Sequence, residues 1–336
     1  MQKNKRNKVK IAGIGNALVD VLVHLPNETL LQQAGLPRGG MLLVNDEKRE
    51  QLAQLMRPLN PWKSTGGSAG NTIKALSALG ADCVFIGKTG DDDDDAVLLA
   101  NAFQRCGTET RLIKGFLHTG VASTFISPTG ERTFGTCLGA ASTLQANEIT
   151  EQLLSGLNWL HIEGYLVQDH ALIERICELS KQMRMTVSMD LASYNVLAED
   201  VEFARHLVLD YVDVVFANED ESRVFCYGKS PKEALREMAD MCHVAVVKLG
   251  AQGAMARCGK EEYCVEAQCV KVADTTGAGD FFAAGFLYAQ INGASLLQSL
   301  RCGTVMGEQA VQVVGTDLKP EVWHICKRQI LDILRK

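Results

Sequence analysis

The sequence is poor in several features that define other classes of protein. Only 6% of its 336 residues are aromatic, seven are proline, and no apolar run approaches 18 residues. The absence of such a run argues against a membrane-spanning helix. The eleven cysteines are scattered singly without a Cys-x-x-Cys pair, which argues against a zinc or disulfide framework.

An excess of positive charge is also missing. The 34 basic and 40 acidic residues give a net charge of −6, so the chain has no general attraction for nucleic acid or for an anionic membrane. The basic residues between Lys3 and Lys10 are not followed by the apolar segment of a signal peptide. We therefore expect a cytoplasmic protein whose partners are small molecules.

Glycine, in contrast, is abundant. Thirty glycines with few prolines and aromatic residues favour a loop-rich α/β architecture over a β-sandwich. Apolar strand patterns alternate with amphipathic helical patterns, which predicts a parallel sheet with helices on both faces. We expect one domain over residues 1–336. The expected strands are 9–15, 83–87, 159–163, 186–190, 212–217 and 244–249, and the expected helices are 68–79, 94–106, 170–183, 201–209, 231–241, 278–290 and 295–313.

Two segments fit no strand–helix–strand unit. Residues 17–45 and 111–141 contain short alternating patterns without intervening helices, which predicts a small separate β-sheet that acts as a lid. Ligands of parallel α/β sheets bind beyond the carboxyl ends of the strands. That rule directs attention to Asn16, Gly87, Asp190, Asn218 and Gly250.

Two apparent phosphate-binding motifs fail on inspection. The segment 13–18 begins like a dinucleotide fingerprint but ends in Leu18 where glycine is required, so a Rossmann dehydrogenase is not expected. Gly87-Lys88-Thr89 resembles the end of a Walker A loop, but the five aspartates of 91–95 follow and would repel a polyphosphate. We interpret the acidic run as a solvated turn and helix N-terminus.

A glycine-rich segment opens one of the expected helices. It reads Gly66-Gly67-Ser68-Ala69-Gly70-Asn71, and the N–H groups in the first turn of such a helix are free to bind a ligand. The Asn71 amide could reach a polyol. The alternative interpretation is a tight turn in which Asn71 only forms local hydrogen bonds.

A second small-residue segment carries the strongest signal. Asp274-Thr275-Thr276-Gly277-Ala278-Gly279-Asp280 precedes an apolar helix. A helix that begins at Gly277 or Ala278 would aim the next N–H groups at one point, which is an anion hole for a transferring phosphoryl group. A carboxylate beside an anion hole is suited to proton abstraction from an attacking hydroxyl.

Both segments resemble signatures of one family. Residues 274–280 resemble the C-terminal signature of the ribokinase-like (PfkB-type) carbohydrate and nucleoside kinases, and residues 66–71 resemble their N-terminal glycine-rich signature. The segments 15–20 and 162–165 are most similar to adenosine-kinase-type members. Further features agree in order and extend the resemblance over essentially the whole chain: Asp20 after Gly15-Asn16, Gly130-Glu131-Arg132-Thr133, Asn218-Glu219-Asp220-Glu221, and Val247-Lys248-Leu249-Gly250 with Gly253.

The resemblance implies a ribokinase-like α/β fold with a small β-sheet lid. It also implies a kinase that uses Mg²⁺ and transfers the γ-phosphoryl group of ATP to a primary hydroxyl. Asp280 would be the general base beside an anion hole formed by Gly277, Ala278 and Gly279. Asn218 and Glu221 would organise Mg²⁺ and phosphates through water.

Further residues are assigned on the same resemblance. Asp20 and Asn71, with the backbone of Gly66 and Gly67 and with Asn16 nearby, would hold the hydroxyl groups of the acceptor. Lys248 stands where many relatives have a threonine, so the role of its side chain at the nucleotide stays open. The other expected nucleotide-binding residues are Gly250, Gly253 and Thr275, and a potassium ion is expected around Asp274 and the segment 307–315.

The identity of the acceptor depends on Glu163-Gly164-Tyr165. Tyr165 offers a flat face for a purine, which favours adenosine as the substrate and AMP as the product. Glu163 would suit the extra hydroxyls of a free sugar, or it would form an ion pair that faces a helix or the lid. We expect a nucleoside kinase that acts on adenosine, with a sugar kinase acting on ribose or fructose as the alternative.

Overall fold

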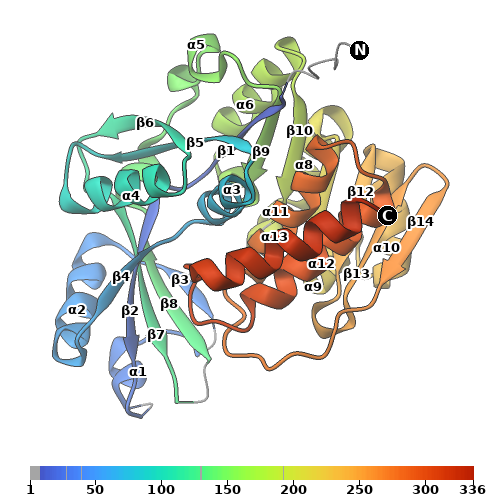
Figure 1. Cartoon of the computed structure of the whole chain (residues 1–336). Coiled ribbons are helices and arrows are strands. Elements are labelled where there is room, and N and C mark those ends of the chain that lie inside the picture. The colour runs from blue at the N-terminus through green and yellow to red at the C-terminus, as the bar shows by residue number, and fades with distance from the viewer. Residues whose placement is uncertain (1–7, 28, 39, 129–130, 192) are drawn as a thin grey trace.

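The computed structural model describes residues 8–27, 29–38, 40–128, 131–191 and 193–336. Nine strands form a large sheet in the order β14-β13-β12-β11-β10-β9-β1-β5-β6 (Figure 1). The seven strands from β12 to β6 pair in parallel, and β13 and β14 add an antiparallel hairpin. These strands are β1 (Lys10–Ile14), β5 (Asp82–Gly90), β6 (Glu109–Gly115), β9 (Trp159–Glu163), β10 (Thr186–Asp190), β11 (Val214–Asn218), β12 (Val244–Lys248), β13 (Ala254–Cys258) and β14 (Glu261–Val265).

Helices cover both faces of the large sheet, as Figure 1 shows. Each face buries its own apolar cluster, which explains why central strands such as β12 are apolar on both sides. Phe216 of β11 packs edge to face on Phe286 with ring centroids 5.4 Å apart. One face carries α5 (Glu151–Leu154), α6 (His170–Gln182), α7 (Tyr194–Glu199), α8 (Val201–Tyr211), α9 (Glu219–Phe225) and α10 (Pro231–Met241), and the other carries α3 (Ser68–Leu79), α4 (Asp94–Arg105), α11 (Ala278–Ile291), α12 (Leu296–Ala310) and α13 (Pro320–Leu334).

A second sheet of five strands lies at the lower left of Figure 1, in the order β3-β8-β7-β2-β4. Together with its two helices it is called the lid sheet below. The helices cover one face of this sheet, where Leu52, Met56 and Phe125 are fully buried. Its elements are β2 (Leu18–His24), α1 (Thr29–Ala34), β3 (Met41–Leu43), α2 (Asp46–Met56), β4 (Trp62–Thr65), β7 (Gly120–Ile126) and β8 (Arg132–Cys137).

The predicted fold class is confirmed: the large sheet has a parallel core with helices on both faces, and a smaller sheet accompanies it. The bounds of the predicted lid segments need correction. Residues 111–115 belong to β6, which pairs with β5 at the edge of the large sheet. β4 joins the lid sheet although it lies outside both segments. An edge strand such as β6 is half-exposed, so its sequence pattern does not show which sheet it extends. Gly130, which belongs to the second predicted lid segment, lies outside the described residues.

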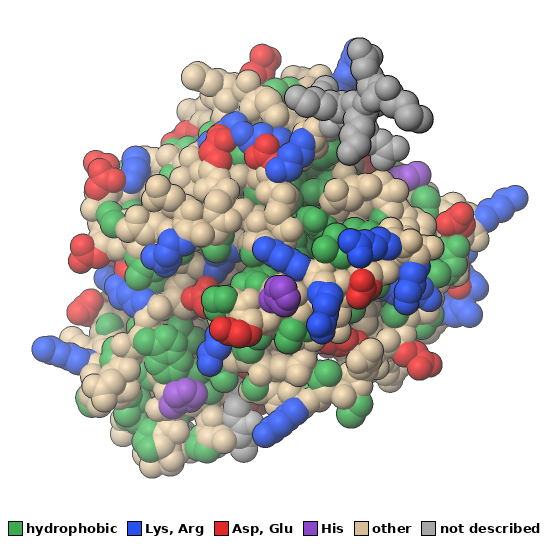
Figure 2. Space-filling view, in the orientation of Figure 1, with side chains coloured by type: hydrophobic (Ala, Val, Ile, Leu, Met, Phe, Trp, Pro, Cys, Tyr) green, Lys and Arg blue, Asp and Glu red, His purple; other side chains and the backbone are tan. Residues whose placement is uncertain are grey.

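On the face drawn in Figure 2, acidic and basic side chains are interspersed. Within the described residues, no helix combines the length and the apolarity that are needed to cross a bilayer.

The contact between α11 and α12 depends on Gly285. A Cβ atom on Gly285 would lie 2.4 Å from the carbonyl oxygen of Cys302 and 2.7 Å from Cγ of Met306. We predict that Gly285→Ala lowers the free energy of unfolding in urea by about 1–3 kcal/mol, because α12 must move. Gly307→Ala on α12 is the matched control, since its nearest neighbour would be 3.6 Å away. This control should be neutral or slightly stabilising, and equal losses in the two variants would contradict the packing argument.

Candidate active site

Five neighbouring parallel strands end in polar residues at the same edge of the large sheet. Asn218 of β11 stands opposite Lys248 of β12, and Asp190 of β10 stands opposite Glu163 of β9. Asn16 follows β1, which is the next strand along. The carboxyl ends of the strands therefore form one continuous row of polar groups.

Glu163 joins this row to the start of α3. Its side chain is buried, and Oε1 accepts hydrogen bonds from the backbone N (3.2 Å) and Nδ2 (2.8 Å) of Asn16. Oε2 accepts from the backbone N of Ala69 (3.0 Å) in the first turn of α3. Burial raises the pKa of Glu163, although these donors oppose the shift. Glu163 thus accepts hydrogen bonds that tie the glycine-rich turn to the end of β9. These hydrogen bonds are present where the sequence suggested an ion pair.

The turn before α3 requires glycine at position 67. Gly67 has φ of +82°, and a Cβ atom there would lie 2.4 Å from the carbonyl oxygen of Asn16. This close approach brings Asn16 against the start of α3 and leaves Ser68 and Asn71 on its first turns.

Ser68 and Asn71 both hold the carboxylate of Asp280. Ser68 Oγ donates to Oδ1 (2.7 Å), and Asn71 Nδ2 donates to Oδ2 (2.9 Å). Burial raises the pKa of Asp280 to about 7, against the lowering effect of these two donors. The two small-residue segments, more than 200 residues apart, therefore meet at one carboxylate.

Asp280 lies in the first turn of α11, whose N-terminus has no side-chain cap. Gly277 occupies the capping position with φ of +72° and has no side-chain oxygen to offer, while its carbonyl oxygen accepts from the backbone N of Phe281 (2.8 Å). Uncapped N–H groups at a helix N-terminus favour an anion. The predicted anion hole of Gly277, Ala278 and Gly279 lies at this helix N-terminus, where the backbone N of Ala278 donates to the carbonyl oxygen of Thr275 (3.2 Å).

A half-buried ammonium group, that of Lys248, lies next to this helix N-terminus. A Cβ atom on Gly279 would be 3.1 Å from Nζ of Lys248, and Nζ lies 2.6 Å from Oδ2 of Asp190. Burial disfavours the charged lysine, but Asp190 and Glu221 outweigh it and raise the pKa of Lys248. A lysine that stays protonated beside the anion hole is suited to binding phosphate.

Asn218 and Glu221 form a capping box at the start of α9. Asn218 Oδ1 accepts from the backbone N of Glu221 (2.9 Å), and the Glu221 carboxylate accepts from the backbone N (2.7 Å) and Nδ2 (2.6 Å) of Asn218. Burial raises the pKa of Glu221 to about 7. The Asn-x-x-Glu spacing thus has a structural role, and it also leaves a buried carboxylate close to Lys248 and Asp190.

The lid sheet contributes Asp20 from the opposite side. Asp20 lies on β2 and packs on the glycine-rich turn, because a Cβ atom on Gly66 would be 2.3 Å from Oδ1 of Asp20. Burial raises the pKa of Asp20 to about 6, while Lys74 and Arg132 lower it. Sequence reasoning missed Arg132 as a neighbour of the site.

Asp274 does not present a free carboxylate to a cation. It forms an ion pair with the buried Arg132 of β8, and it accepts hydrogen bonds from the backbone N of Thr276 (3.0 Å) and of Gly315 (2.7 Å). The guanidinium group therefore takes the place expected for potassium at this side chain. No local pattern indicates this pair, because its members are 142 residues apart in the sequence.

The remaining predicted residues surround this centre. Gly250 and Gly253 form the turn that follows Lys248, where the backbone N of Leu249 donates to the carbonyl oxygen of Gly253 (2.8 Å). Thr275 is exposed before α11. Tyr165 is half-buried against the apolar cluster of the large sheet, and burial together with Glu163 and Asp280 raises the pKa of its hydroxyl.

A cavity of about 490 Å³ lies at the opposite ends of the strands, which are their amino ends. Its lining includes residues Thr186, Val187 and Asp213, which lie at the amino ends of β10 and β11. None of the polar groups described above lines it. The site is therefore assigned to the carboxyl edge, where the polar groups converge.

The fold and this arrangement define a phosphotransferase with a hydroxyl acceptor: an uncapped helix N-terminus and a lysine for phosphate lie beside a carboxylate with a raised pKa. Residues 41–322 match the pfkB family carbohydrate kinase. The chain belongs to this family, and the resemblance inferred from its motifs is confirmed.

The relatives include nucleoside and sugar kinases. The adenosine kinase of Schizophyllum commune is 26% identical over 341 residues, which are 92% of this chain and 97% of that protein. An uncharacterized sugar kinase of Archaeoglobus fulgidus is 27% identical over 245 residues, 71% of this chain and 95% of that protein. The crystal structure of adenosine kinase from Sinorhizobium meliloti is 26% identical, with a TM-score of 0.86 and coverage of 96% of this chain and 99% of that chain.

The raised pKa of Asp20 should make the stability of the folded chain depend on pH. A carboxyl whose pKa is about 6 in the folded chain and about 3.9 in the unfolded chain binds more protons when folded, so stability falls as the pH rises between these values. We predict that Asp20→Asn raises the Tm of the ligand-free protein at pH 7.5 and has little effect at pH 4. Thermal unfolding at both pH values measures the difference, with the exposed Asp332→Asn as the control. A change in Tm that is the same at both pH values would contradict the assignment.

Proposed function

We propose that this protein is a nucleoside kinase that phosphorylates the 5′-hydroxyl of adenosine with ATP, giving AMP and ADP. The observation that carries the proposal is the position of Asp280. Its carboxylate is held by Ser68 and Asn71, and it belongs to the first turn of the uncapped helix α11. A base and an anion site are thereby fixed side by side.

Asp280 takes the proton of the acceptor hydroxyl. The oxygen attacks the γ-phosphorus, and the bond between the γ-phosphorus and the bridging oxygen breaks to release ADP. A pKa of about 7 suits a base at neutral pH, because such a group is partly ionised and still accepts a proton well.

The N–H groups of Gly279 and its neighbours at the start of α11 stabilise the charge of the transferring phosphoryl group. Lys248 adds a positive charge beside these N–H groups, since its Nζ lies near Gly279. Asp190 holds Lys248 in this position through the 2.6 Å contact. Lys248 thus acts on phosphate, and the turn with Gly250 and Gly253 that follows it approaches the nucleotide together with Thr275.

The residues around Glu221 fit the Mg²⁺ that accompanies ATP in this family. Glu221 and Asp190 supply carboxylate oxygens, and Asn218 supplies an amide oxygen, which are ligand types that Mg²⁺ prefers, directly or through water. Burial raises the pKa of Glu221 to about 7, and a nearby cation would favour its ionised form. When bound, Mg²⁺ would neutralise charge on the phosphates.

On the acceptor side, Asp20 and Asn71 hold the ribose hydroxyls. Asn71 Oδ1 is buried and has no hydrogen-bond partner in the described part of the chain, so it can accept a hydrogen bond from a hydroxyl. Asp20 adds a carboxylate from the lid sheet, beside the backbone of Gly66 and Gly67. Closure of the lid sheet would exclude water from the reacting groups.

Adenosine is favoured as the acceptor by Tyr165 and by the relatives. Tyr165 follows Glu163 by two residues at the carboxyl end of β9. Burial raises the pKa of its hydroxyl, and the negative charges of Glu163 and Asp280 add to this shift. Glu163 is fully engaged with Asn16 and Ala69, which makes it a positioning residue rather than a ligand for sugar hydroxyls. A sugar kinase remains the second candidate because the Archaeoglobus fulgidus relative bears that name.

The base assignment is tested with Asp280→Asn. We expect kcat to fall by about 10²–10⁴-fold, while ATP binding measured by calorimetry persists. The wild-type kcat/KM should fall as the pH drops below about 7, because the protonated base is inactive, and the variant should lack the contribution of this group. Asp94→Asn, in the first turn of α4, is the control and should keep wild-type kcat. Near-normal turnover by Asp280→Asn would disprove the assignment.

The acceptor is tested by measuring ADP release with adenosine, inosine, guanosine, ribose and fructose. Adenosine should give the highest kcat/KM. Tyr165→Ala should raise the KM for adenosine by about 2–12-fold, the equivalent of the 0.5–1.5 kcal/mol of an aromatic stack, and Tyr165→Phe should restore it. Efficient phosphorylation of ribose or fructose with none of adenosine would overturn the nucleoside assignment and leave a sugar kinase.

A further inference from the structure

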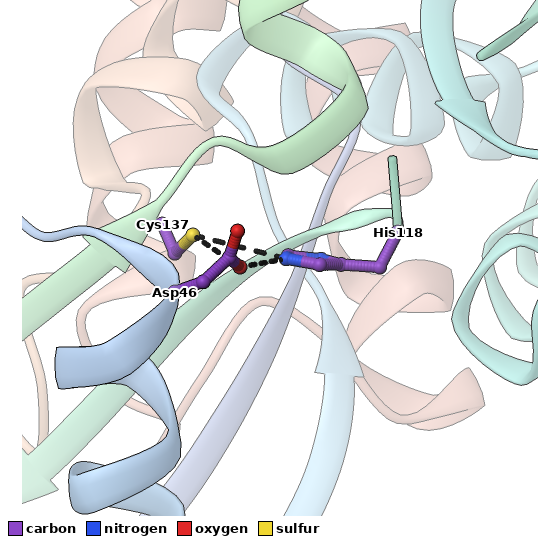
Figure 3. A group of neighbouring side chains, drawn as sticks. All are labelled: Asp46, His118 and Cys137. Atoms are coloured by element: carbon purple, nitrogen blue, oxygen red, sulfur yellow. Dashed lines mark hydrogen bonds and ion pairs between the residues drawn. The ribbon is translucent and has the colours of Figure 1, made fainter. Parts of the chain in front are cut away.

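Three side chains of metal-ligating type converge at the junction between the lid sheet and the large sheet (Figure 3). Asp46 is the first residue of α2, His118 lies in the connection from β6 to β7, and Cys137 is the last residue of β8. Among the described residues, this is the one group of three or more such side chains whose ligand atoms all lie within 4.8 Å of one another. It lies outside the proposed active site.

The ligand atoms face one another, as Figure 3 shows. Sγ of Cys137 lies 3.6 Å from Oδ1 of Asp46 and 3.9 Å from Nε2 of His118, and Nε2 forms a hydrogen-bonded ion pair with the same Oδ1. Tetrahedral Zn²⁺ with ordinary bond lengths separates a sulfur ligand from a nitrogen or oxygen ligand by about 3.6 Å. The two sulfur distances already match this geometry, and only the contact between Asp46 and His118 must lengthen.

The surrounding chain fixes the direction of the imidazole ring. Nδ1 of His118 lies 2.6 Å from the carbonyl oxygen of Thr119, so the other ring nitrogen points at the group. Thr119 is itself held by Asp93, which accepts from its backbone N (2.6 Å) and its Oγ1 (2.8 Å). Such an outer hydrogen bond is typical of metal-ligating histidines.

The group has both a buried and an open side. Cys137 is buried, the side chain of His118 is 28% exposed, and that of Asp46 is 61% exposed. An ion could enter from solvent and keep one position for water. Arg49 Nε lies 3.5 Å from Oδ1 of Asp46, so one positive charge is already near the carboxylate.

We propose that Asp46, His118 and Cys137 bind one divalent transition-metal ion, with Zn²⁺ as the best fit. A thiolate, an imidazole and a carboxylate form a mixed set that suits Zn²⁺ and excludes Mg²⁺ and Ca²⁺, which prefer oxygen alone. Binding replaces the hydrogen bond between Nε2 and Asp46 and requires the thiolate, so the proton of the Cys137 thiol is released to solvent. The two anionic ligands balance the charge of the ion.

The positions of the three ligands imply that the bound ion would restrain the lid sheet. The connection from β6 to β7 links the large sheet to the lid sheet. The chain that follows β8 links the lid sheet to residues 139–143, which pack on β5. An ion at this place ties these two connections to α2. It would therefore restrict the movement of the lid sheet relative to the large sheet.

Metal binding is tested with Co²⁺, whose thiolate complexes absorb in the near ultraviolet. The reduced full-length protein, freed of metal with a chelator, should bind one Co²⁺ with a thiolate charge-transfer band, and added Zn²⁺ should abolish the band. Cys137→Ser should lose the band, and His118→Asn should bind Co²⁺ at least about 100-fold more weakly, since it loses a direct ligand. The Tm of each metal-free variant verifies that it folds.

Cys258→Ser provides a matched control. Sγ of Cys258 lies 3.7 Å from Nε2 of His243, so this pair repeats the spacing of a thiol and an imidazole without a third ligand in the described chain. The control should keep the band at full stoichiometry. A wild-type protein without the band, a band that survives in Cys137→Ser, or a band lost in Cys258→Ser would each overturn the proposal.

A second measurement addresses the mechanical role independently of kinase activity. Amide exchange at residues 116–119 and 135–138 should slow when Zn²⁺ is added to the wild-type protein, and it should stay unchanged in Cys137→Ser. Exchange that does not respond to Zn²⁺ in the wild-type protein would contradict the proposed restraint on the lid sheet. Neither experiment depends on which acceptor is phosphorylated.

Discussion

The geometry of the site depends on one buried carboxylate, that of Glu163. An ionised group buried at the end of a strand is costly unless N–H donors satisfy it, and here the donors come from Asn16 and from the first turn of α3. This requirement fixes α3 against the carboxyl edge of the large sheet. Ser68 and Asn71, carried by the same turns, then hold Asp280. Glu163, which makes no contact with Asp280 in this chain of hydrogen bonds, thus sets where the proposed base lies.

Acidic groups outnumber basic groups at the site. Asp190, Glu221 and Asp280 all interact with the ammonium group of Lys248, and burial raises the pKa of both Glu221 and Asp280 to about 7. Negative charge in excess would repel the phosphates of a free nucleotide. In the proposed function, a nucleotide that arrives with Mg²⁺ would bring the missing positive charge, and the helix N-terminus and Lys248 would contact the phosphoryl group. Such a site would favour the magnesium complex over the free nucleotide.

The sequence predicted those parts of the structure that depend on local pattern. Strand β9 and helix α3 begin and end as expected because their apolar spacing and their flanking residues act over a few positions. The edge strand β6 and the pair of Arg132 with Asp274 could not be predicted, since both depend on which distant segment lies alongside. The roles of Asn218 and Glu221 were predicted only in part. The family resemblance implied a cation site, and the structure adds a helix cap, which is a local pattern that the Asn-x-x-Glu spacing could have indicated.

The site also lowers the stability of the free protein at neutral pH. Asp20, Glu221 and Asp280 all have a pKa raised mainly by burial, so the folded chain holds protons that the unfolded chain has lost by pH 7. The contribution of these three groups to the free energy of unfolding therefore decreases from about pH 4 to about pH 7. A bound cation or a substrate hydroxyl that hydrogen-bonds to the ionised carboxylates reverses this effect. Ligand binding should therefore stabilise the chain more at pH 8 than at pH 5. At the higher pH the buried carboxylates are ionised, and a bound cation or hydroxyl group offsets the cost of burying their charge.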